Sequence, residues 1–288
     1  MNVTNINPKR FHRSQIKFYL ILLPISIVMI LPIIYIFSQA LKPIDELILF
    51  PPRFFVAKPT MRNFQMLLGA SSEGGIPLSR YIFNSIVSVS FTVVLTILIS
   101  VMAGYALSKK NYRSNRAFFK INQSALMFVP IAVAIPSFIV VSSLGITNTY
   151  FAHILPLVAM PVGLFLLKQF IDQLPNDIIE AARIDGANDF QIVVKIIVPL
   201  VKSAIATVAI LVFQISWANM STSELYIDAE GMKTFAFFMG TLISRVEESF
   251  AGQGIAAAAG LIMFLPNLII FIFLQGKVMD TMAHSGVK

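Results

Sequence analysis

Few side chains in this sequence have the types and the spacing that catalysis requires. The chain has no cysteine, so it forms no disulfide and offers no thiolate nucleophile. Its three histidines lie far apart, and we interpret His12, His153 and His284 as surface or interfacial residues rather than metal ligands. It contains no Gly-x4-Gly-Lys-Ser/Thr phosphate loop, no carboxylate pair and no spaced Ser/His/Asp set. The sequence therefore predicts a chain that is no enzyme and that binds no metal or cofactor itself.

The composition is that of a membrane protein. Of 288 residues, 57% are hydrophobic and only 12% are charged, and the mean hydropathy is +0.79. A soluble domain has about 25% charged residues. The net charge of +8 would also suit a nucleic-acid-binding protein, so the distribution of the charges has to decide between the two classes.

The apolar residues form long segments that predict an all-α, polytopic protein with six transmembrane helices. The first segment, 18–37, has the 20 residues that a bilayer of about 30 Å needs, whereas the apolar region of a signal peptide has about 7–15. A polar turn at 142–149 divides the uncharged stretch 121–167 into two spans. The six predicted spans are 18–37, 81–108, 121–141, 150–167, 203–223 and 249–276.

The remaining segments complete the predicted organisation. Residues 1–17 form an N-terminal segment, 18–276 the membrane domain and 277–288 a C-terminal tail. The external loop 41–80 contains one short helix near 61–68. The apolar segment 235–243 is too short to cross a bilayer and is expected to lie at the interface or packed in protein.

The basic residues orient the six predicted spans. With the N-terminus in the cytoplasm, 15 of the 22 lysines and arginines fall on the inner side and seven on the outer side. This is the bias of the positive-inside rule, so nucleic-acid binding is not needed to explain the net charge. Both termini and the segment 172–198 are then cytoplasmic.

The predicted spans contain no well-buried Asp, Glu, Lys or Arg, although ion-coupled transporters usually keep such groups at mid-membrane. Four neutral polar residues are candidates for a substrate pathway: Asn84, Gln214, Trp217 and Asn219. For Trp217 and Asn219 we prefer a packing role over contact with substrate. Small residues form seams at Ser100 and Gly104 and within 252–260, and their spacing leaves open whether they face this chain or a partner.

The charged stretch 177–199 predicts two short cytoplasmic helices. Pro175 can open the first helix, and Gly186 favours a left-handed cap at its end. Asn188 or Asp189 can cap the second helix, and Pro199 marks the entry to the fifth span. The first helix would present Ala181 and Ala182 as a shallow surface for a partner, and Glu180 can pair with Arg183.

This stretch resembles the cytoplasmic loop of permease subunits in bacterial ATP-binding-cassette (ABC) importers. Glu-Ala-Ala stands at 180–182, Gly186 follows, and Ile-Ile-Val-Pro stands at 196–199, where valine replaces the usual leucine. The string Glu-Ala-Ala-Arg-Ile-Asp-Gly-Ala at 180–187 is similar to the carbohydrate branch, the maltose and multiple-sugar permeases. The resemblance implies a type I importer permease fold. It also implies an ATPase-coupling role for Glu180, Ala181, Ala182, Asp185, Gly186, Ala187 and Pro199.

Further segments resemble this branch in the same order along the chain. They are Pro51-Pro52 with Pro59-Thr60, Asn84-Ser85, Ala103–Leu107 (Ala-Gly-Tyr-Ala-Leu), Leu144–Thr149 and Ser285–Lys288. The segment Trp217-Ala218-Asn219 departs from the family's Trp-Asn pair, so no role is carried over to these residues.

The resemblance implies the other components of an importer. They are a second homologous permease, two ATPase subunits that hold ATP and Mg²⁺, and an extracytoplasmic solute-binding protein that delivers a sugar, most simply an oligosaccharide. The chain would lie in the bacterial plasma membrane. The alternatives are an importer for a non-sugar solute, an ion-coupled transporter or channel, and a membrane scaffold without transport.

Overall fold

The computed structural model describes residues 15–73, 75–246 and 250–285. Within these residues the secondary structure is helical, with no strand, which confirms the all-α class. The chain divides into two compact units, Met1–Gly69 with Ile243–Leu261, and Ala70–Leu242 with Ile262–Lys288. Predictions for residues 1–14, which include His12, and for 286–288 lie outside the described residues, as does the side chain of His284.

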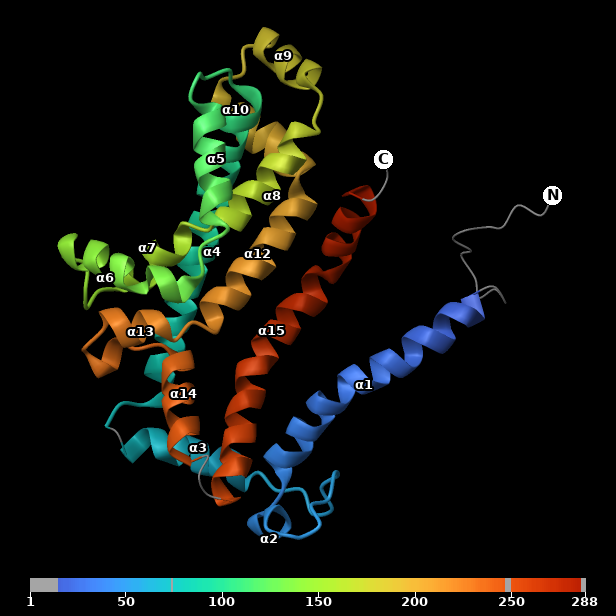
Figure 1. Cartoon of the computed structure of the whole chain (residues 1–288), viewed down its shortest axis with the longest axis vertical. Helices are drawn as coiled ribbons and strands as arrows, with labels where there is room; N and C mark the ends of the chain where they lie inside the picture. Colours follow the sequence, from blue (N-terminus) through green and yellow to red (C-terminus); the bar gives the residue numbers. More distant parts are fainter. Residues whose placement is uncertain (1–14, 74, 247–249, 286–288) are drawn as a thin grey trace. The chain divides into compact units, whose positions relative to one another are not determined.

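The first unit contains the first predicted span. This is α1 (Ile16–Leu41), a helix of 26 residues (Figure 1). Its apolar side chains are exposed along most of its length. It is followed by α2 (Ile44–Leu47) and by the start of α3 (Arg62–Glu73), the short helix expected near 61–68. The beginning of α15 (Phe250–Ser285) completes the unit, where Ala258 packs against Ala40.

The second unit is built around α4 (Leu78–Lys109), the second predicted span. Helices α7 (Tyr150–Val158), α8 (Pro161–Asp172) and α12 (Lys202–Trp217) pack against it (Figure 1). Every fourth residue of α4 is small or polar and buried, so these side chains form one stripe along the helix. The stripe comprises Asn84, Ser88, Thr92, Thr96, Ser100 and Gly104.

The seam at Ser100 and Gly104, whose partner the sequence left open, faces α8 of this chain. A Cβ atom on Gly104 would lie 3.2 Å from Cδ1 of Ile171 and 3.4 Å from the backbone nitrogen of Lys168. A Cβ atom on Gly163 would lie 3.3 Å from Oγ of Ser100. Small residues on both helices therefore allow their backbones to approach closely.

Two of the predicted spans, 121–141 and 150–167, are bent rather than straight. Helix α5 (Asn115–Ala125) meets the segment Pro130–Ser143, formed by η2 (Pro130–Val133) and α6 (Ala134–Ser143), at 110°. Helices α7 and α8 meet at 45°. In both cases the residue before a proline, Val129 or Met160, has an extended backbone, because the proline ring disfavours helical geometry there.

In the described part of the chain, three helical segments are long and apolar enough to cross a membrane, namely α1, α4 and Gly252–Gly276 of α15. Three bent pairs bring the number to six if each pair forms one span. The fifth predicted span, 203–223, begins close to the start of α12 but extends past its end, since α12 ends at Trp217 and a separate helix, α13 (Ser221–Tyr226), follows. After η4 (Glu230–Met232), the apolar segment predicted at 235–243 forms α14 (Phe235–Val246), and its side chains Phe235 and Met239 are buried.

The α4–α8 contact predicts the outcome of a substitution at Gly163. The change Gly163→Val should lower the stability of the chain by about 1–3 kcal/mol, because extra methyl groups would overpack the seam. Thermal unfolding in detergent measures this effect. Gly260→Val in α15 is the matched control, since a Cβ there meets no atom within 4 Å. Equal unfolding midpoints for the two variants would show that the seam is not closely packed.

A second prediction concerns Glu46, whose carboxylate closes the loop between α1 and α3. The pKa of Glu46 is held below its ordinary value of 4.5, mainly by the hydrogen bond from the backbone N–H of Ala57. Burial opposes this effect by raising the pKa, whereas the N–H of Lys58 and two basic side chains lower it further. A lowered folded-state pKa stabilises the loop above the ordinary value, and this contribution is lost as the pH falls through the lowered pKa.

Hydrogen-exchange protection of the Ala57 and Lys58 amides, corrected for intrinsic rates, should therefore decrease below about pH 4.5. In Glu46→Gln the protection should be lower at neutral pH and nearly independent of pH. If the wild-type protection does not change on acidification, the carboxylate does not hold the loop closed.

Candidate functional site

The cytoplasmic segment predicted from the charged stretch forms two short helices joined at a sharp corner. Helix α9 (Asn176–Ile184) begins directly after Pro175, as expected. Gly186 has φ +84°, a left-handed conformation in which a Cβ atom is disfavoured. Its N–H donates to the carbonyl of Arg183 at 3.0 Å, and the N–H of Ala187 donates to that of Ala182 at 2.9 Å. These two bonds are those of a Schellman cap.

The second helix begins with a capping box. The side chain of Asn188 accepts a hydrogen bond from the N–H of Gln191 at 2.9 Å, and the side chain of Gln191 accepts one from the N–H of Asn188 at 3.0 Å. This reciprocal pair satisfies two N–H groups that would otherwise lack partners. Asn188, one of the two residues expected to cap this helix, therefore has that role.

The second helix is longer than predicted and continues through Pro199. It consists of α10 (Asp189–Ile192), a π-helical turn η3 (Val193–Ile197) and α11 (Val198–Leu200). Pro199 has no N–H to donate to the preceding turn, and such positions are accommodated by a widened turn. The chain then bends by 84° into α12, so the break comes two residues after Pro199.

The corner rests on an apolar base formed by the ends of the longer helices. From the corner itself, Ile179, Ala182, Ile192 and Ile197 are buried. They pack in one cluster with residues of α4, α8 and α12, including Val101, Tyr105, Leu167, Ile171 and Ala204. The two short helices are therefore a fixed extension of the second unit, at the end opposite α13 (Figure 1).

A network of charged and polar groups joins the corner to the end of α4. Tyr105 donates its hydroxyl proton to Oδ1 of Asp189 at 2.9 Å, and Nζ of Lys110 pairs with Oδ2 of Asp189 at 2.7 Å. Arg183 pairs with Asp189 at 3.8 Å and lies 3.4 Å from the Tyr105 hydroxyl. The expected pair of Glu180 with Arg183 is wrong, because no ion pair joins them in the described part of the chain and Arg183 turns toward Asp189 instead.

The local sequence indicates Asp189 only as a possible helix cap. Its acceptor role for Tyr105 and Lys110 depends on the approach of segments about 80 residues apart, which no local pattern indicates. Lys109 makes a similar connection to the start of α9, donating to the carbonyl of Leu174 at 2.6 Å and to Oδ1 of Asn176 at 3.0 Å. Lys109 and Lys110, two of the basic residues on which the predicted orientation depends, therefore also hold the corner in place.

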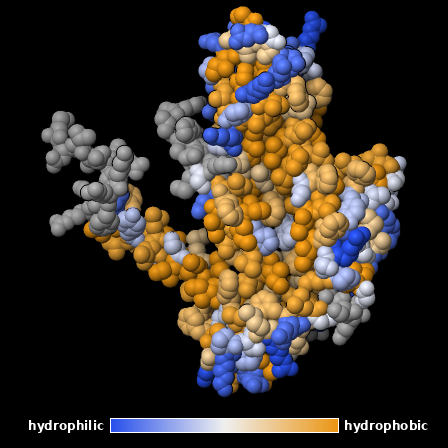
Figure 2. Space-filling view, turned by 180° about the vertical axis from the view of Figure 1, so that it is seen from behind, coloured by the Kyte–Doolittle hydropathy of each residue, from blue (hydrophilic) through white to orange (hydrophobic). Residues whose placement is uncertain are grey.

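The outward face of the corner carries exposed apolar side chains. Ile184 is 87% exposed and Phe190 is 68% exposed, and Glu180, Ala181 and Asp185 are exposed beside them. The expectation that both alanines form this surface is corrected, because Ala182 points into the apolar base and is only 9% exposed. Figure 2 shows hydrophilic residues gathered at this end, above a largely hydrophobic middle.

The four candidates for a substrate pathway lie in different surroundings. Asn84 is fully buried, donates to the carbonyls of Gly231 and Lys233, and accepts from the hydroxyl of Tyr150 at 2.7 Å. All of its polar atoms are thus engaged within the chain. This geometry favours a structural role that holds the loop before α14 against α4.

Trp217 and Asn219 are also engaged within the chain, as the preferred packing interpretation expected. Trp217 is buried, stacks on Phe213 and donates its ring N–H to the carbonyl of Met263 at 3.1 Å. The side chain of Asn219 accepts from the N–H and the hydroxyl of Thr222, at 3.0 and 2.9 Å, and caps α13. Gln214 is exposed, and of the four it alone presents its side chain outward.

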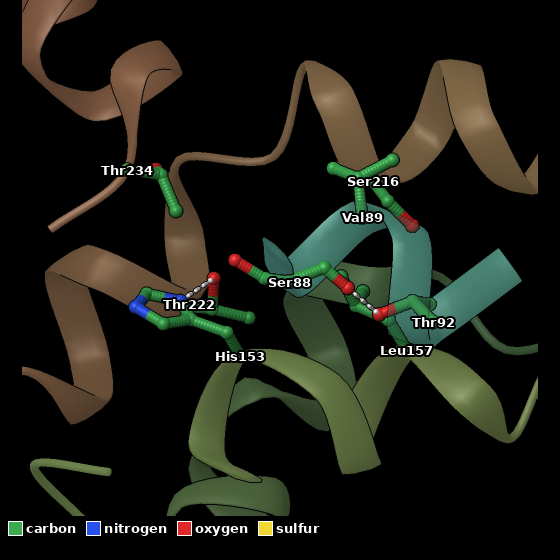
Figure 3. A pocket seen from close by; sticks show the side chains of 8 residues that line it. All are labelled: Ser88, Val89, Thr92, His153, Leu157, Ser216, Thr222 and Thr234. Atoms are coloured by element: carbon green, nitrogen blue, oxygen red, sulfur yellow. Dashed lines mark hydrogen bonds between the residues drawn. The ribbon is translucent and has the colours of Figure 1, made fainter. Parts of the chain in front are cut away.

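His153 is buried within the chain, contrary to the expectation that it lies at a surface or an interface. It is 1% exposed, with one ring nitrogen 3.0 Å from the hydroxyl of Thr222 and the other 3.1 Å from the carbonyl of Met232. It borders a cavity of about 10 Å³ (Figure 3), at the lower limit for one water molecule, so no sugar fits there. The lining residues are Ser88, Val89, Thr92, His153, Leu157, Ser216, Thr222 and Thr234.

Within the described residues, no three His, Asp or Glu side chains come together as metal ligands. The feature of this unit that could engage a macromolecule is the exposed corner of α9 and α10, which connects two membrane segments. Residues 96–276 match the family model of the binding-protein-dependent transport system inner membrane component. The chain belongs to this family.

Relatives of the permease cover nearly its full length. It is 28% identical over 282 residues to the arabinooligosaccharides transport system permease protein AraQ of Bacillus subtilis, covering 97% of this chain and 98% of that protein. It is 27% identical over 259 residues to the sulfoquinovosyl glycerol transport system permease protein SmoH of Agrobacterium fabrum, covering 89% and 88%.

A solved structure shares the fold of the permease. A bacterial ABC transporter involved in the import of the acidic polysaccharide alginate contains a chain that superposes with a TM-score of 0.78 at 24% identity, covering 94% of this chain and 99% of that one. This confirms the importer permease fold that the resemblance of the 180–199 segment implied.

The two adjacent alanines of α9 predict opposite outcomes for the same substitution. Ala182→Leu should destabilise the chain by about 1–3 kcal/mol, because the larger side chain overpacks the apolar base. Ala181→Leu should change stability by less than about 0.5 kcal/mol, since that position is exposed. Thermal unfolding of the two variants in detergent provides the measurement, and equal effects would contradict the orientation of α9.

Proposed function

We propose that this permease is the transmembrane subunit of an ATP-driven ABC importer that moves a sugar, specifically an oligosaccharide, into the cytoplasm. The observation that carries the proposal is the exposed corner of α9 and α10, fixed to the ends of α4, α8 and α12 by an apolar base and by the Asp189 network. Such a surface suits a partner that transmits motion to the pore.

The energy for transport comes from two separate ATPase subunits, which hold ATP and Mg²⁺. The absence of a phosphate loop from the full sequence supports this assignment. The outward face of the corner, with Glu180, Ala181, Asp185 and Gly186, docks on an ATPase, and Ala187 supports this face from the apolar base. Closure of the ATPases then moves α8 and α12 with the corner as one rigid element, because Pro199 and the buried base leave little freedom between them.

The chain forms half of a pore, and a second homologous permease forms the other half. A solute-binding protein on the outer face delivers the substrate, in keeping with the binding-protein-dependent family. We place 18–276 in the bacterial plasma membrane as six spans and assign 1–17, 172–198 and 277–288 to the cytoplasm. The lysines and arginines support this orientation, since most of them fall on the inner side.

The assignment of a sugar as substrate rests on the relatives. Their names specify arabinooligosaccharides and a sulfoquinovosyl glycerol, and the solved structure belongs to an alginate importer. All three solutes are carbohydrates or glycosides, and two of them are acidic. Of the four candidate residues, Gln214 is best placed to meet a solute, because it is exposed whereas Asn84 and Trp217 are buried.

The docking role of the corner predicts a specific effect of Ala181→Leu. This variant should fold normally and yet lose co-purification of the ATPase subunits, because a leucine at a close contact costs about 1–3 kcal/mol, which corresponds to a loss of affinity of roughly 5- to 150-fold. Ala229→Leu is the matched control, an exposed alanine on the proposed outer side. If Ala181→Leu still co-purifies with the ATPase, the corner is not part of the docking surface.

Uptake measurements test the function as a whole. Cells that lack this chain should lose ATP-dependent uptake of one member of a panel of labelled solutes, comprising neutral pentose oligosaccharides, alginate oligosaccharides and glycerol 3-phosphate, and the wild-type chain should restore it. If the chain restores uptake of glycerol 3-phosphate alone, the substrate is a non-sugar solute and not a sugar. Uptake driven by an ion gradient without ATP would refute the importer class.

A further inference from the structure

We propose that the loop between α2 and α3 is a lipid anchor that inserts its apolar tip into the headgroup region of the bilayer beside the C-terminal end of α1. The apolar tip consists of Ile48, Leu49, Phe50 and Phe55. This inference concerns the first unit alone and goes beyond the proposed transport function. Three observations support it, namely the rigidity of the loop, its depth along α1 and the exposure of its apolar side chains.

The loop is held in one conformation by contacts on all sides of the tip. Glu46 accepts hydrogen bonds from the N–H groups of Ala57 and Lys58, at 2.9 and 2.7 Å. Lys42, only 1% exposed, donates through Nζ to the carbonyl of Arg53. These bonds, together with the N–H of Thr60, which donates to the carbonyl of Leu41 at 2.8 Å, fasten both ends of the loop to the end of α1.

A second set of contacts fixes the depth of the loop. Asn63 donates through its side chain to the carbonyls of Ala40 and Lys42, at 2.9 and 2.8 Å, and so ties the start of α3 to the same end of α1. The carbonyl of Phe54 accepts from the hydroxyl of Ser38 at 2.8 Å, and its ring lies 5.4 Å from that of Tyr35.

The loop therefore folds back along α1 instead of projecting away from the membrane. Tyr35 precedes the end of α1 at Leu41 by six residues, or about 9 Å at 1.5 Å per residue. It also lies within the apolar segment 18–37. Phe54 thus reaches the level of the outermost part of the hydrocarbon core, and Phe55, whose ring is 4.9 Å from that of Phe54, lies beside it.

The tip exposes apolar side chains at this depth. Phe50 is 94% exposed, Phe55 67%, Ile48 59% and Leu49 42%. A rigid surface segment with four exposed apolar residues marks an interaction site rather than ordinary surface. Exposed Arg53 and Lys58 flank the tip. Aromatic residues at the interface with basic residues next to them are the usual composition of segments that lie in the headgroup layer.

The depth of the loop favours lipid over a protein partner as the occupant of this surface. A solute-binding protein approaches from the aqueous side, whereas the contacts with Tyr35 and Ser38 hold the loop against the side of α1, whose apolar side chains are exposed. In the proposed orientation the leaflet concerned is the outer one. The depth itself follows from the contacts with α1 and does not depend on that orientation.

Site-directed spin labelling tests the proposal, and the absence of cysteine from the chain makes it direct. The full chain, carrying Phe50→Cys or Phe55→Cys with a nitroxide label, is reconstituted into vesicles of phosphatidylethanolamine and phosphatidylglycerol. Both labels should collide more often with oxygen, which partitions into lipid, than with a water-soluble nickel chelate. Asp45→Cys, an exposed acidic position on α2 just before the loop, is the control and should show the opposite preference.

Two results would overturn the proposal. Labels at 50 and 55 that meet the nickel chelate as readily as the label at 45 would place the tip in water. Labels that are shielded from both reagents only after the solute-binding protein is added would make that protein the occupant. The measurement needs no transport, so its failure is distinguishable from a failure of the proposed function.

Discussion

The close approach of α4 and α8 is the contact on which the second unit depends. Gly104 and Gly163 leave so little space that the backbones of the two helices nearly touch, and α7 and α12 then pack around the same face of α4. Membrane helices gain little from excluding water from one another, so small residues and short polar side chains are the means by which they associate. The stripe from Asn84 to Gly104 provides both.

This contact also determines where the corner of α9 and α10 sits. Tyr105 directly follows Gly104, and Lys109 and Lys110 end α4, so the seam that brings α4 against α8 brings these three side chains to α9 and α10. These contacts hold the inner face of the corner, and its outer face is exposed. A partner that moves it must move α8 and α12 as well, which is the property that a coupling element requires.

Prolines account for the departures of the helices from straight spans. Pro130 and Pro161 force an extended residue before them, and Pro199 is accompanied by a π-helical turn before the bend into α12. Such breaks are tolerated within a membrane where protein or a cavity satisfies the freed backbone groups.

The sequence alone determined the features that local chemistry controls. Its apolar segments gave the membrane class and the position of most spans, and Pro175, Gly186 and Asn188 defined the ends of the two short helices, because caps and left-handed turns depend on neighbouring residues. The Glu-Ala-Ala segment and its spacing also indicated the family, which the family model later confirmed.

Only the tertiary structure decided which side of each element faces the chain itself. Ala182 is buried while Ala181 is exposed, Asp189 instead of Glu180 pairs with Arg183, His153 is enclosed, and the loop after α2 folds back along α1. Each of these outcomes results from contacts between segments distant in the sequence, or from the orientation of a helix about its own axis, which decides between adjacent residues such as Ala181 and Ala182. A period of hydrophobic residues cannot specify them, because in a membrane protein apolar side chains face lipid and protein alike.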